Sequence, residues 1–479
     1  MLARTSLSVA LLGTVLLAAE PARTISSAPG VTSAQIVQQS PRDLALSLTA
    51  AGSHPKIGIP DVVALDGTAA TQATGKLLAD TLAYDLDFER EYLVVSRTAS
   101  ANVPLASTAE ALAFDRWSQL GAHFVLFGTA RADGDKLSVE VKMVSVGSGT
   151  AGQLGTGFQY DGCQVSNPRY CAHFISDDIH AKLRNVEGVA RTKLAFTSDR
   201  DASRMTGRLV ENAGQGKEIY ISDYDGANQQ RVTANRNLNI TPKWGPDPRT
   251  LAYTSYVSGF QDIYITTFDG RSPLKPAGGN DDVHNMLPAI SPDGSKIAFA
   301  STRGSSSGYL DIWVVNRDGT GLTNLTPNTP TSIESSPTWS PSGHQIAFTS
   351  DMTGSNQIWY MNADGTGRRK ISGDQHADRP TWSLLNYIAY TTGSGPGHDI
   401  AVFDIASGVT RVLTDGIGSN SSPTVAPNGR HVAFVTTRWG REQIGIVDFP
   451  EPGKPRRVTE AGTNTYPSWS PSPRIPGSK

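Results

Sequence analysis

The sequence predicts an α/β domain over residues 54–190 followed by an all-β, six-bladed β-propeller over residues 191–479. Three observations predict this architecture. Helical and extended patterns alternate in the first region, a unit of blade size repeats in the second, and the chain ends on a strand that the first repeat lacks. A repeat of roughly 40 to 50 residues built from short strands is typical of a propeller.

The composition fits two globular domains with many turns. A chain of 479 residues exceeds one ordinary core, and its 47 Gly and 29 Pro suit turn-rich β structure. Lys and Arg together number 42, against 44 Asp and Glu. Proteins that bind nucleic acid or anionic lipid carry a basic surplus, which is missing here. We therefore expect protein or neutral partners.

The beginning of the chain has the pattern of an export signal. Arg4 supplies a positive charge, Leu7–Ala19 form an uncharged apolar run, and small residues surround its end. An apolar run of this length falls short of the roughly 20 residues that span a bilayer. We predict a signal peptide over residues 1–19, with a short membrane anchor as the alternative. Residues 20–53, rich in Ser, Thr and Ala, are predicted to be a flexible N-terminal segment.

Residues 54–190 alternate between extended and helical patterns, which favours a small α/β domain. Leucines recur at helical spacing after Thr68, and Ser107 with Glu110 has the form of a capping box. An Asp-Gly-Asp turn joins two alternating segments as a hairpin. The expected elements are a strand from Lys56, a helix over 68–88, a buried strand over 92–96, a helix from 107 to 121, strands over 123–127 and 137–144, and a helix over 173–186.

The two cysteines, Cys163 and Cys171, lie eight positions apart. A metal site would need two more converging ligands, and His173 alone does not supply them. In an oxidising compartment we predict a disulfide that closes this small loop.

The repeats after residue 191 carry two signals at fixed positions. The first is a Pro-x-Trp strand or a variant of it, whose prolines are Pro242, Pro288, Pro337, Pro380, Pro423 and Pro467. The second is a strand such as Asp262–Ile265, followed in most repeats by a turn in which Gly supplies a positive φ. The first repeat opens at Lys193 without its Pro-x-Trp strand, and the chain ends on a spare one. We therefore expect the C-terminal strand to complete the first blade and close the ring.

Several strings resemble the TolB family of the bacterial Tol–Pal envelope system. They are Trp117–Ala122, Ser176–Asp178, Arg191–Phe196 and Ser222–Gly226, in addition to the blade repeat itself. The resemblance covers about residues 55 to 472 and implies a periplasmic, non-enzymatic monomer. It implies docking of the lipoprotein Pal at the mouth of the propeller channel, in support of outer-membrane integrity and constriction at division. The family's N-terminal segment also binds the inner-membrane protein TolA, but residues 20–53 do not match that segment.

Three motifs suggest other chemistry and are better explained by the fold. Gly304–Gly308 fits Gly-x-Ser-x-Gly, but a nucleophile of that type needs a strand-to-helix turn. Asn316–Gly319 has the form of the start of a calcium loop, yet it lacks the later oxygen ligands and recurs as a turn. Tryptophans share one position in different repeats, which favours packing between blades. No metal and no cofactor are predicted.

The candidate partner-binding residues come from the loops that lead into the innermost strands. In a propeller these loops converge on the channel mouth, where polar groups of mixed charge suit a protein ligand. The candidates are His284, Asn285, Glu334, Ser335, His376, Asp378, Arg379, Asn420 and Tyr466. The His284–Asn285 pair also resembles the TolB loop whose histidine faces Pal.

Two other functions stay open. A propeller enzyme related to peptidases would need a separate hydrolase domain, and a lyase would need clustered His and basic residues. The 9 histidines are scattered along the chain. An unrelated envelope scaffolding propeller would have the same shape, and purification of the native partner would distinguish it.

Overall fold

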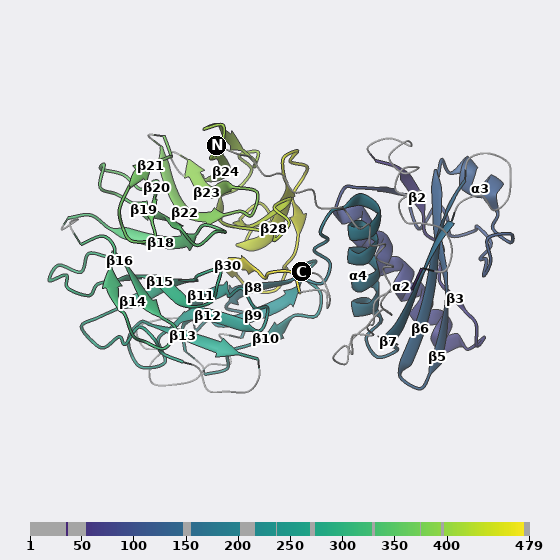
Figure 1. The fold of residues 1–479 in the computed structure, drawn as a ribbon, viewed down its shortest axis with the longest axis horizontal. Helices are drawn as coiled ribbons and strands as arrows, with labels where there is room; N and C mark the ends of the chain where they lie inside the picture. The colour runs from purple at the N-terminus through teal and green to yellow at the C-terminus, as the bar shows by residue number, and fades with distance from the viewer. Residues whose placement is uncertain are drawn as a thin grey trace, which may run out of the picture.

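In the computed structural model, a mixed sheet with helices lies beside a ring of six small sheets (Figure 1). The residues that the structure describes are 35–36, 54–146, 155–201, 216–235, 237–268, 274–327, 331–373, 375–393 and 397–473. The predicted signal peptide lies outside them. Of the predicted flexible segment 20–53, only Gln35–Ile36 are described, as strand β1. No helix within the described ranges is long and apolar enough to cross a bilayer.

The N-terminal sheet has the strand order β1-β7-β6-β5-β2-β4, and β3 pairs with β5. Its strands are β2 (Lys56–Gly58), β3 (Val63–Ala64), β4 (Leu93–Val94), β5 (Phe124–Asp133), β6 (Lys136–Ser145) and β7 (Gly155–Gln164). β5, β6 and β7 run antiparallel, whereas β2 is parallel to β4 and β5. The α/β class and the β5–β6 hairpin were both predicted.

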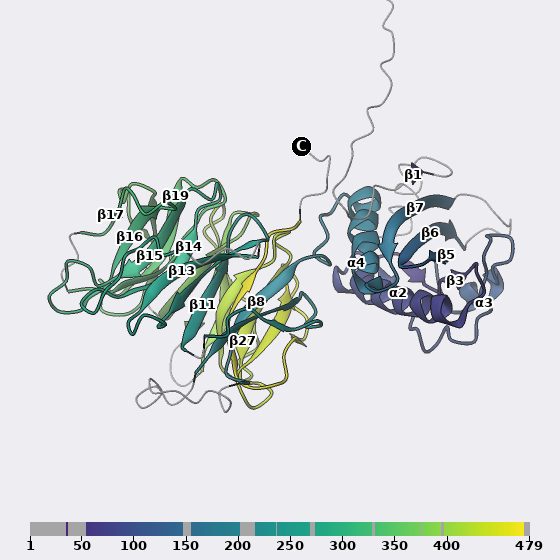
Figure 2. The ribbon, with the colours of Figure 1, turned by 90° about the horizontal axis from the view of Figure 1, so that it is seen from below.

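Helices cover both faces of this sheet. They are α2 (Ala69–Phe88), α3 (Phe114–Gln119) and α4 (Pro168–Ile179), the last continued by a π-helical turn over His180–Arg184. On β5, Phe124 and Leu126 pack with α2 and α4, whereas Val125 and Phe127 pack with Trp117 of α3. This alternation follows from the two-residue period of a strand. α2 and α4 lie between the sheet and the propeller (Figures 1 and 2).

Two helix starts differ from the sequence prediction. The Ser107–Glu110 pattern does not open a helix, because Thr108 binds the Glu110 carboxylate within a turn and α3 begins only at Phe114. α4 begins at Pro168 rather than at His173. Asn167 caps it and Pro168 fills its first turn, which together form a strong start signal.

Two strands also differ. The predicted buried strand over 92–96 is only the short β4, and Leu93 is 53% exposed there. β7 was not predicted, because glycines and polar residues interrupt its alternation. Phe158 and Tyr160 nevertheless point into the core from this strand.

The two cysteines form a disulfide between β7 and α4. Their Cα atoms are 5.3 Å apart, and both side chains are buried in the main core of the domain. The bond ties the helix that faces the propeller to the sheet behind it.

The propeller begins with β8 and consists of six blades. Blade 1 is β8 (Lys193–Ser198), β9 (Glu218–Asp223), β10 (Gln230–Arg231) and β30 (Asn464–Trp469). Blade 2 is β11 (Asn239–Trp244), β12 (Thr250–Ser255) and β13 (Asp262–Thr267), and an isolated bridge joins Ile265 of β13 to Leu274. Blade 3 is β14 (Asn285–Ile290), β15 (Lys296–Ser301), β16 (Asp311–Asn316) and β17 (Thr323–Asn324).

The remaining three blades repeat the same four-stranded plan. Blade 4 is β18 (Glu334–Trp339), β19 (Gln345–Ser350), β20 (Gln357–Asn362) and β21 (Arg369–Lys370). Blade 5 is β22 (His376–Trp382), β23 (Tyr387–Gly393), β24 (Asp399–Asp404) and β25 (Thr410–Val412). Blade 6 is β26 (Asn420–Val425), β27 (His431–Thr436), β28 (Gln443–Asp448) and β29 (Arg456–Arg457).

The predicted closure of the ring is confirmed. The last strand, β30, pairs antiparallel with the first propeller strand, β8, and becomes the innermost strand of blade 1. The joint leaves no free sheet edge between the first and last repeats, which would otherwise invite pairing with another chain.

The tryptophans of the repeats pack between blades, as predicted. Trp244, Trp339, Trp382 and Trp469 are all buried. Trp339 of blade 4 donates its indole N–H to the carbonyl of Ala289 in blade 3, at 3.0 Å. The repeated position is therefore part of the core.

The two domains meet around Phe88, the last residue of α2. Its ring packs against Tyr224 and His431 of the propeller, with ring centroids 4.6 Å and 4.5 Å apart. Phe88 belongs to the same apolar cluster as Trp469 and other propeller residues. The apolar cluster of blades 1 and 6 thus extends through this side chain to the end of α2.

Two buried histidines cross the same interface. His173 of α4 donates from Nδ1 to Asp85 of α2 at 2.8 Å, and its Nε2 lies 3.9 Å from Asp223 of β9. Burial alone would lower the pKa of His173, but these carboxylates outweigh it and raise the pKa to about 9. His173 is therefore charged at neutral pH and is shared by both domains.

His431 of β27 is held in a similar way. Its ring nitrogens lie 3.1 Å from Glu89 at the end of α2 and 2.9 Å from Asp448 of β28. Burial opposes the charged form, yet the two carboxylates raise the pKa of His431. The His431 ring thus links the two domains as well.

Candidate functional site

The propeller channel is lined by a repeated backbone irregularity. Each innermost strand carries a β-bulge at the residue before the repeated proline. These six residues are Thr241, Leu287, Ser336, Arg379, Ser422 and Tyr466, and each has a φ between 52° and 57°. Non-glycine residues rarely adopt this conformation, and residues before proline favour extended backbone. Such strain costs about 1 to 3 kcal/mol per residue and is found preferentially at functional sites.

Hydrogen bonds between blades stabilise several of the bulges. In three blades the strained residue donates its backbone N–H to a threonine hydroxyl of the preceding blade. The pairs are Leu287 with Thr254 (3.1 Å), Arg379 with Thr349 (3.1 Å) and Ser422 with Thr391 (3.0 Å). The blade-to-blade contact therefore fixes which residue faces the channel.

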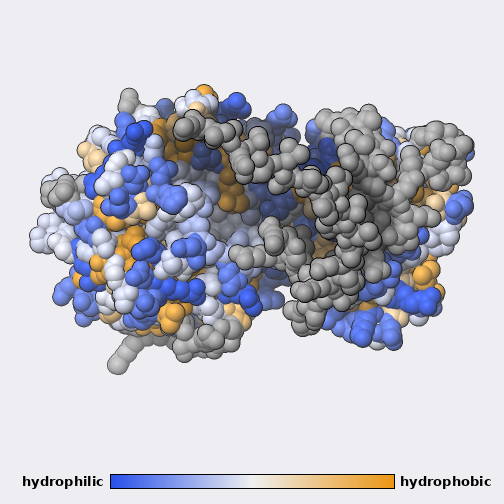
Figure 3. All heavy atoms as spheres, in the orientation of Figure 1, coloured by the Kyte–Doolittle hydropathy of each residue, from blue (hydrophilic) through white to orange (hydrophobic). Residues whose placement is uncertain are grey.

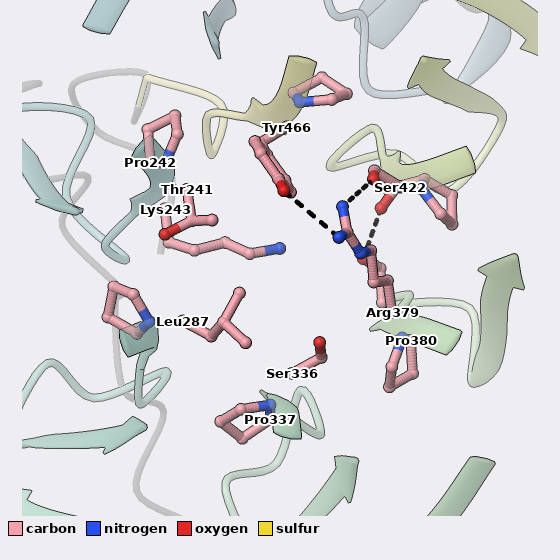
Figure 4. Close-up of a pocket in the computed structure, with 14 residues that line it drawn as sticks. Thr241, Pro242, Lys243, Leu287, Ser336, Pro337, Arg379, Pro380, Ser422 and Tyr466 are labelled. Carbon is pink, nitrogen blue, oxygen red and sulfur yellow. Dashed lines mark hydrogen bonds between the residues drawn. The ribbon is translucent and has the colours of Figure 1, made fainter. Parts of the chain in front are cut away.

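The six bulged residues and the prolines after them surround a cavity of about 50 Å³. Figure 4 shows Leu287, Arg379 and Tyr466 directed inward from different blades, with the prolines forming the wall. A cavity of this size holds a few water molecules or one small chemical group. Hydrophilic residues cover most of the propeller face seen in Figure 3, with smaller hydrophobic patches among them.

Arg379 connects three blades across the channel. Its guanidinium donates to Ser422 Oγ at 2.6 Å and to Tyr466 Oη at 3.3 Å, and it lies 4.5 Å from the centroid of the Tyr466 ring. On its other side Nε faces Asp378 at 3.3 Å. Burial opposes its charge, but Tyr466 and Asp378 raise the pKa of Arg379. The guanidinium is therefore firmly positioned and charged.

Lys243 adds a second cation. It follows Pro242 in blade 2, and its side chain extends across the channel toward Arg379 and Tyr466 (Figure 4). Burial, and then the neighbouring charge of Arg379, lower the pKa of Lys243 to about 8. Two like charges thus share one small cavity.

Three predicted partner contacts need correction. Asn285, Glu334 and Asn420 are fully buried. Asn285 donates to Asp262 of the preceding blade at 2.9 Å, and Asn420 donates to Asp399 at 3.1 Å. The Glu334 carboxylate accepts from two serine hydroxyls of its own blade. These side chains form buried hydrogen bonds inside the propeller and are not accessible to a partner.

The other predicted residues stay close to the channel. Arg379 and Tyr466 line the cavity itself. His284, Ser335 and His376 are half-buried at the beginning of the innermost strands, and Asp378 lies beside Arg379. The rings of His376 and His398 are 5.5 Å apart, within one blade.

Besides the prolines, six lining residues were not predicted from the sequence. They are Thr241, Lys243, Leu287, Ser336, Thr381 and Ser422. The repeated proline was the available signal, because the residue before it faces the channel in every blade. The positive φ that turns this residue inward is not encoded by Gly or Asn, so it had no signature of its own.

Comparison with known proteins identifies the family. Residues 180–473 match the family described as TolB beta propeller domain. The Tol-Pal system protein TolB of Bordetella pertussis is 30% identical over 419 residues, which cover 86% of this chain and 88% of the relative. The Bordetella bronchiseptica protein of the same name has the same identity and coverage.

The chain belongs to the TolB family.

The TolB fold extends over both domains. The crystal structure of TolB from Acinetobacter baumannii matches with a TM-score of 0.69 and 22% identity, over 92% of this chain and all of that one. The fold predicted from the repeats is therefore confirmed.

Other motifs of this TolB-family chain are structural. Gly304–Gly308 lies between β15 and β16, so no helix follows its serines, and both glycines have positive φ. Asp318 accepts bonds from the N–H and the hydroxyl of Thr320, as expected for a turn. Within the described part of the chain, no three His, Cys, Asp or Glu side chains are grouped as metal ligands would be.

Proposed function

We propose that this chain is the periplasmic TolB component of a Tol–Pal envelope system and that it docks the lipoprotein Pal at the propeller channel. The observation that carries the proposal is its 30% identity, over 86% of the chain, to proteins named Tol-Pal system protein TolB. In this role the protein supports outer-membrane integrity and envelope constriction during division. Export requires removal of the first residues, in keeping with the predicted signal peptide.

The docking face includes the end of the channel where the innermost strands begin. His284, Ser335 and His376 are half-buried there, and Arg379 and Tyr466 lie further inside. A partner can therefore contact a polar rim first and the channel residues next, the arrangement usual at protein interfaces. TolA has no assigned site in this proposal, because residues 20–53 do not match the TolA-binding segment of the family.

A binding role agrees better with these features than catalysis does. The Ser residues of Gly304–Gly308 lie on a loop between two strands, which lacks the geometry of a nucleophile elbow. The strained residues converge on a cavity of about 50 Å³, which is too small for a polymer substrate but suits an inserted side chain.

Binding of Pal to single variants tests the proposal. His284→Ala and Arg379→Ala should each weaken binding by roughly tenfold or more, the loss expected for a polar contact at an interface centre. Lys454→Ala, at an exposed lysine, is the matched control. Affinity is measured by calorimetry and folding by thermal unfolding. If both channel variants bind Pal as tightly as the unaltered protein while folded, the docking face is wrong.

A further inference from the structure

The internal repeats allow each channel position to be compared across six blades. The residues before the repeated proline are Thr241, Leu287, Ser336, Arg379, Ser422 and Tyr466, and those after it are Lys243, Ala289, Thr338, Thr381, Thr424 and Ser468. Of these twelve residues only Lys243 and Arg379 carry a charge, and both are cations. Both lie on the wall of the same cavity.

Packing does not account for Lys243. In other blades a small hydroxyl residue at this position bonds to a neighbouring blade. Thr381 donates to the carbonyl of Pro423 at 2.8 Å, and the hydroxyls of Thr424 and Ser468 accept from the backbone N–H groups of Trp469 and Trp244, each at 3.1 Å. Lysine has no acceptor atom and cannot replace the hydroxyls of Thr424 and Ser468 in these bonds. It places an ammonium group in the channel instead.

The two cations differ in what neutralises them. Arg379 has the Asp378 carboxylate at 3.3 Å. No ion pair among the described residues includes Lys243, and the charged neighbour that lowers its pKa is the like charge of Arg379. Because burial weakens solvent screening, this excess of positive charge attracts an anion more strongly inside the cavity than it would in water.

We propose that the centre of the channel binds a single carboxylate group, held between Lys243 Nζ and the Arg379 guanidinium. The cavity of about 50 Å³ admits one such group and excludes a larger anion-bearing ring. The hydroxyls of Ser336 and Ser422, on the same wall, are further donors. The carboxylate comes either from a small soluble acid or from an acidic side chain of a docked protein. Only the second source rests on the proposed function.

The first experiment uses acetate as the probe and the full mature chain with ¹³C-methylated lysines. The Lys243 signal is assigned by its loss in Lys243→Thr, which places in blade 2 the residue that blades 4, 5 and 6 already have. Acetate, at constant ionic strength against chloride, should shift the Lys243 signal saturably. It should also raise the pKa of Lys243 above about 8, because a bound anion favours the ammonium form.

Variants separate binding from general charge effects. Arg379→Ser reproduces the serine of blades 4 and 6 and should weaken acetate binding on the order of tenfold. Lys454→Thr removes an exposed lysine and should leave the affinity unchanged. Should Lys243→Thr fold poorly, Lys243→Arg retains the charge and Lys243→Gln removes it at similar length, so this pair gives the same contrast.

The second experiment distinguishes the two sources with end-blocked Gly-Gly-Glu-Gly-Gly and its Gln counterpart. A response to acetate supports a soluble acid, and a response to the Glu peptide alone supports a protein side chain. If the Lys243 signal of folded protein responds to neither, or equally to chloride or to the Gln peptide, the carboxylate site is refuted. Pal is absent from both experiments, so this result is independent of the docking test.

Discussion

At the scale of single residues, position in the repeat separates fully buried polar side chains from half-buried ones. His284 and Asn285 are neighbours in sequence, yet Asn285 is fully buried and bonded to Asp262, whereas His284 is half-buried and stands before the strand. The sequence predicted both as partner contacts because it showed their polarity but not the side from which the next blade approaches. Because side chains alternate between the two faces of a strand, only one of two neighbouring residues points into the contact between blades.

We predict that Asn285→Ala lowers the free energy of unfolding by about 1 to 3 kcal/mol, because it removes a donor from the buried Asp262. Ser301 would also lose its acceptor. Urea unfolding measures the change, and Pal binding by the folded variant should be unaffected. A variant of normal stability with weakened Pal binding would restore Asn285 to the binding site.

The buried imidazolium of His173 predicts a pH dependence. Its folded-state pKa, about 9, lies above its usual value of 6.5. The stabilisation is therefore fully present below about pH 6.5 and is lost as the pH rises through about 9, to a total of about 3 kcal/mol. Unfolding of the unaltered protein and of His173→Gln should be compared from pH 6 to 10. Their difference in stability should shrink toward alkaline pH, and a constant difference would contradict a charged His173.

At the scale of elements, strongly periodic segments were predictable and irregular ones were not. The helix after Thr68, the β5–β6 hairpin and the blade strands followed from spacing and turn residues. β7 could not be predicted because its glycines break the alternation, and α4 starts before its helical spacing becomes visible, at the Asn167 cap and Pro168. The channel wall was only partly predictable, since a bulge at a non-glycine residue depends on contacts with the preceding blade.

Removal of β30 should destabilise the propeller far more than the length of the segment suggests. Truncation after Gly462 removes Trp469, whose burial alone is worth about 3 to 5 kcal/mol, and exposes strand edges in blade 1. Thermal unfolding and size-exclusion chromatography should show a lower melting temperature and self-association. Truncation after Pro473 keeps all of β30 and serves as the control. Equal melting of the two truncated proteins would refute closure through β30.

At the scale of the whole molecule, the two domains are joined by apolar packing and by ion pairs between buried side chains. Phe88 extends the apolar cluster of blades 1 and 6 into the end of α2, and His173 and His431 each face carboxylates of both domains. This interface could not be predicted from the sequence, because several of its contacts join residues more than a hundred positions apart. Such long-range pairings have no local pattern.

We predict that Phe88→Ala loosens the arrangement of the two domains without unfolding either. The lost ring contacts with Tyr224 and His431 should cost about 3 to 5 kcal/mol at the interface. Small-angle X-ray scattering should show a larger radius of gyration, and calorimetry should resolve two transitions. Leu105→Ala, at an exposed apolar residue of the α/β domain, is the control. An unchanged scattering curve for Phe88→Ala would show that other contacts hold the domains together.

The bulges of the innermost strands have a consequence for how such channels diversify. Because the backbone turns one residue per blade toward the axis, its side chain can be exchanged without repacking the tryptophans behind it. In this chain the residues at the six equivalent positions, from blade 2 around the ring to blade 1, are Thr, Leu, Ser, Arg, Ser and Tyr. Two of these positions depend on each other where their side chains meet, as Arg379 meets Ser422 and Tyr466. Ligand preference can therefore change through substitutions at these six positions, while the packing contacts between the blades stay the same.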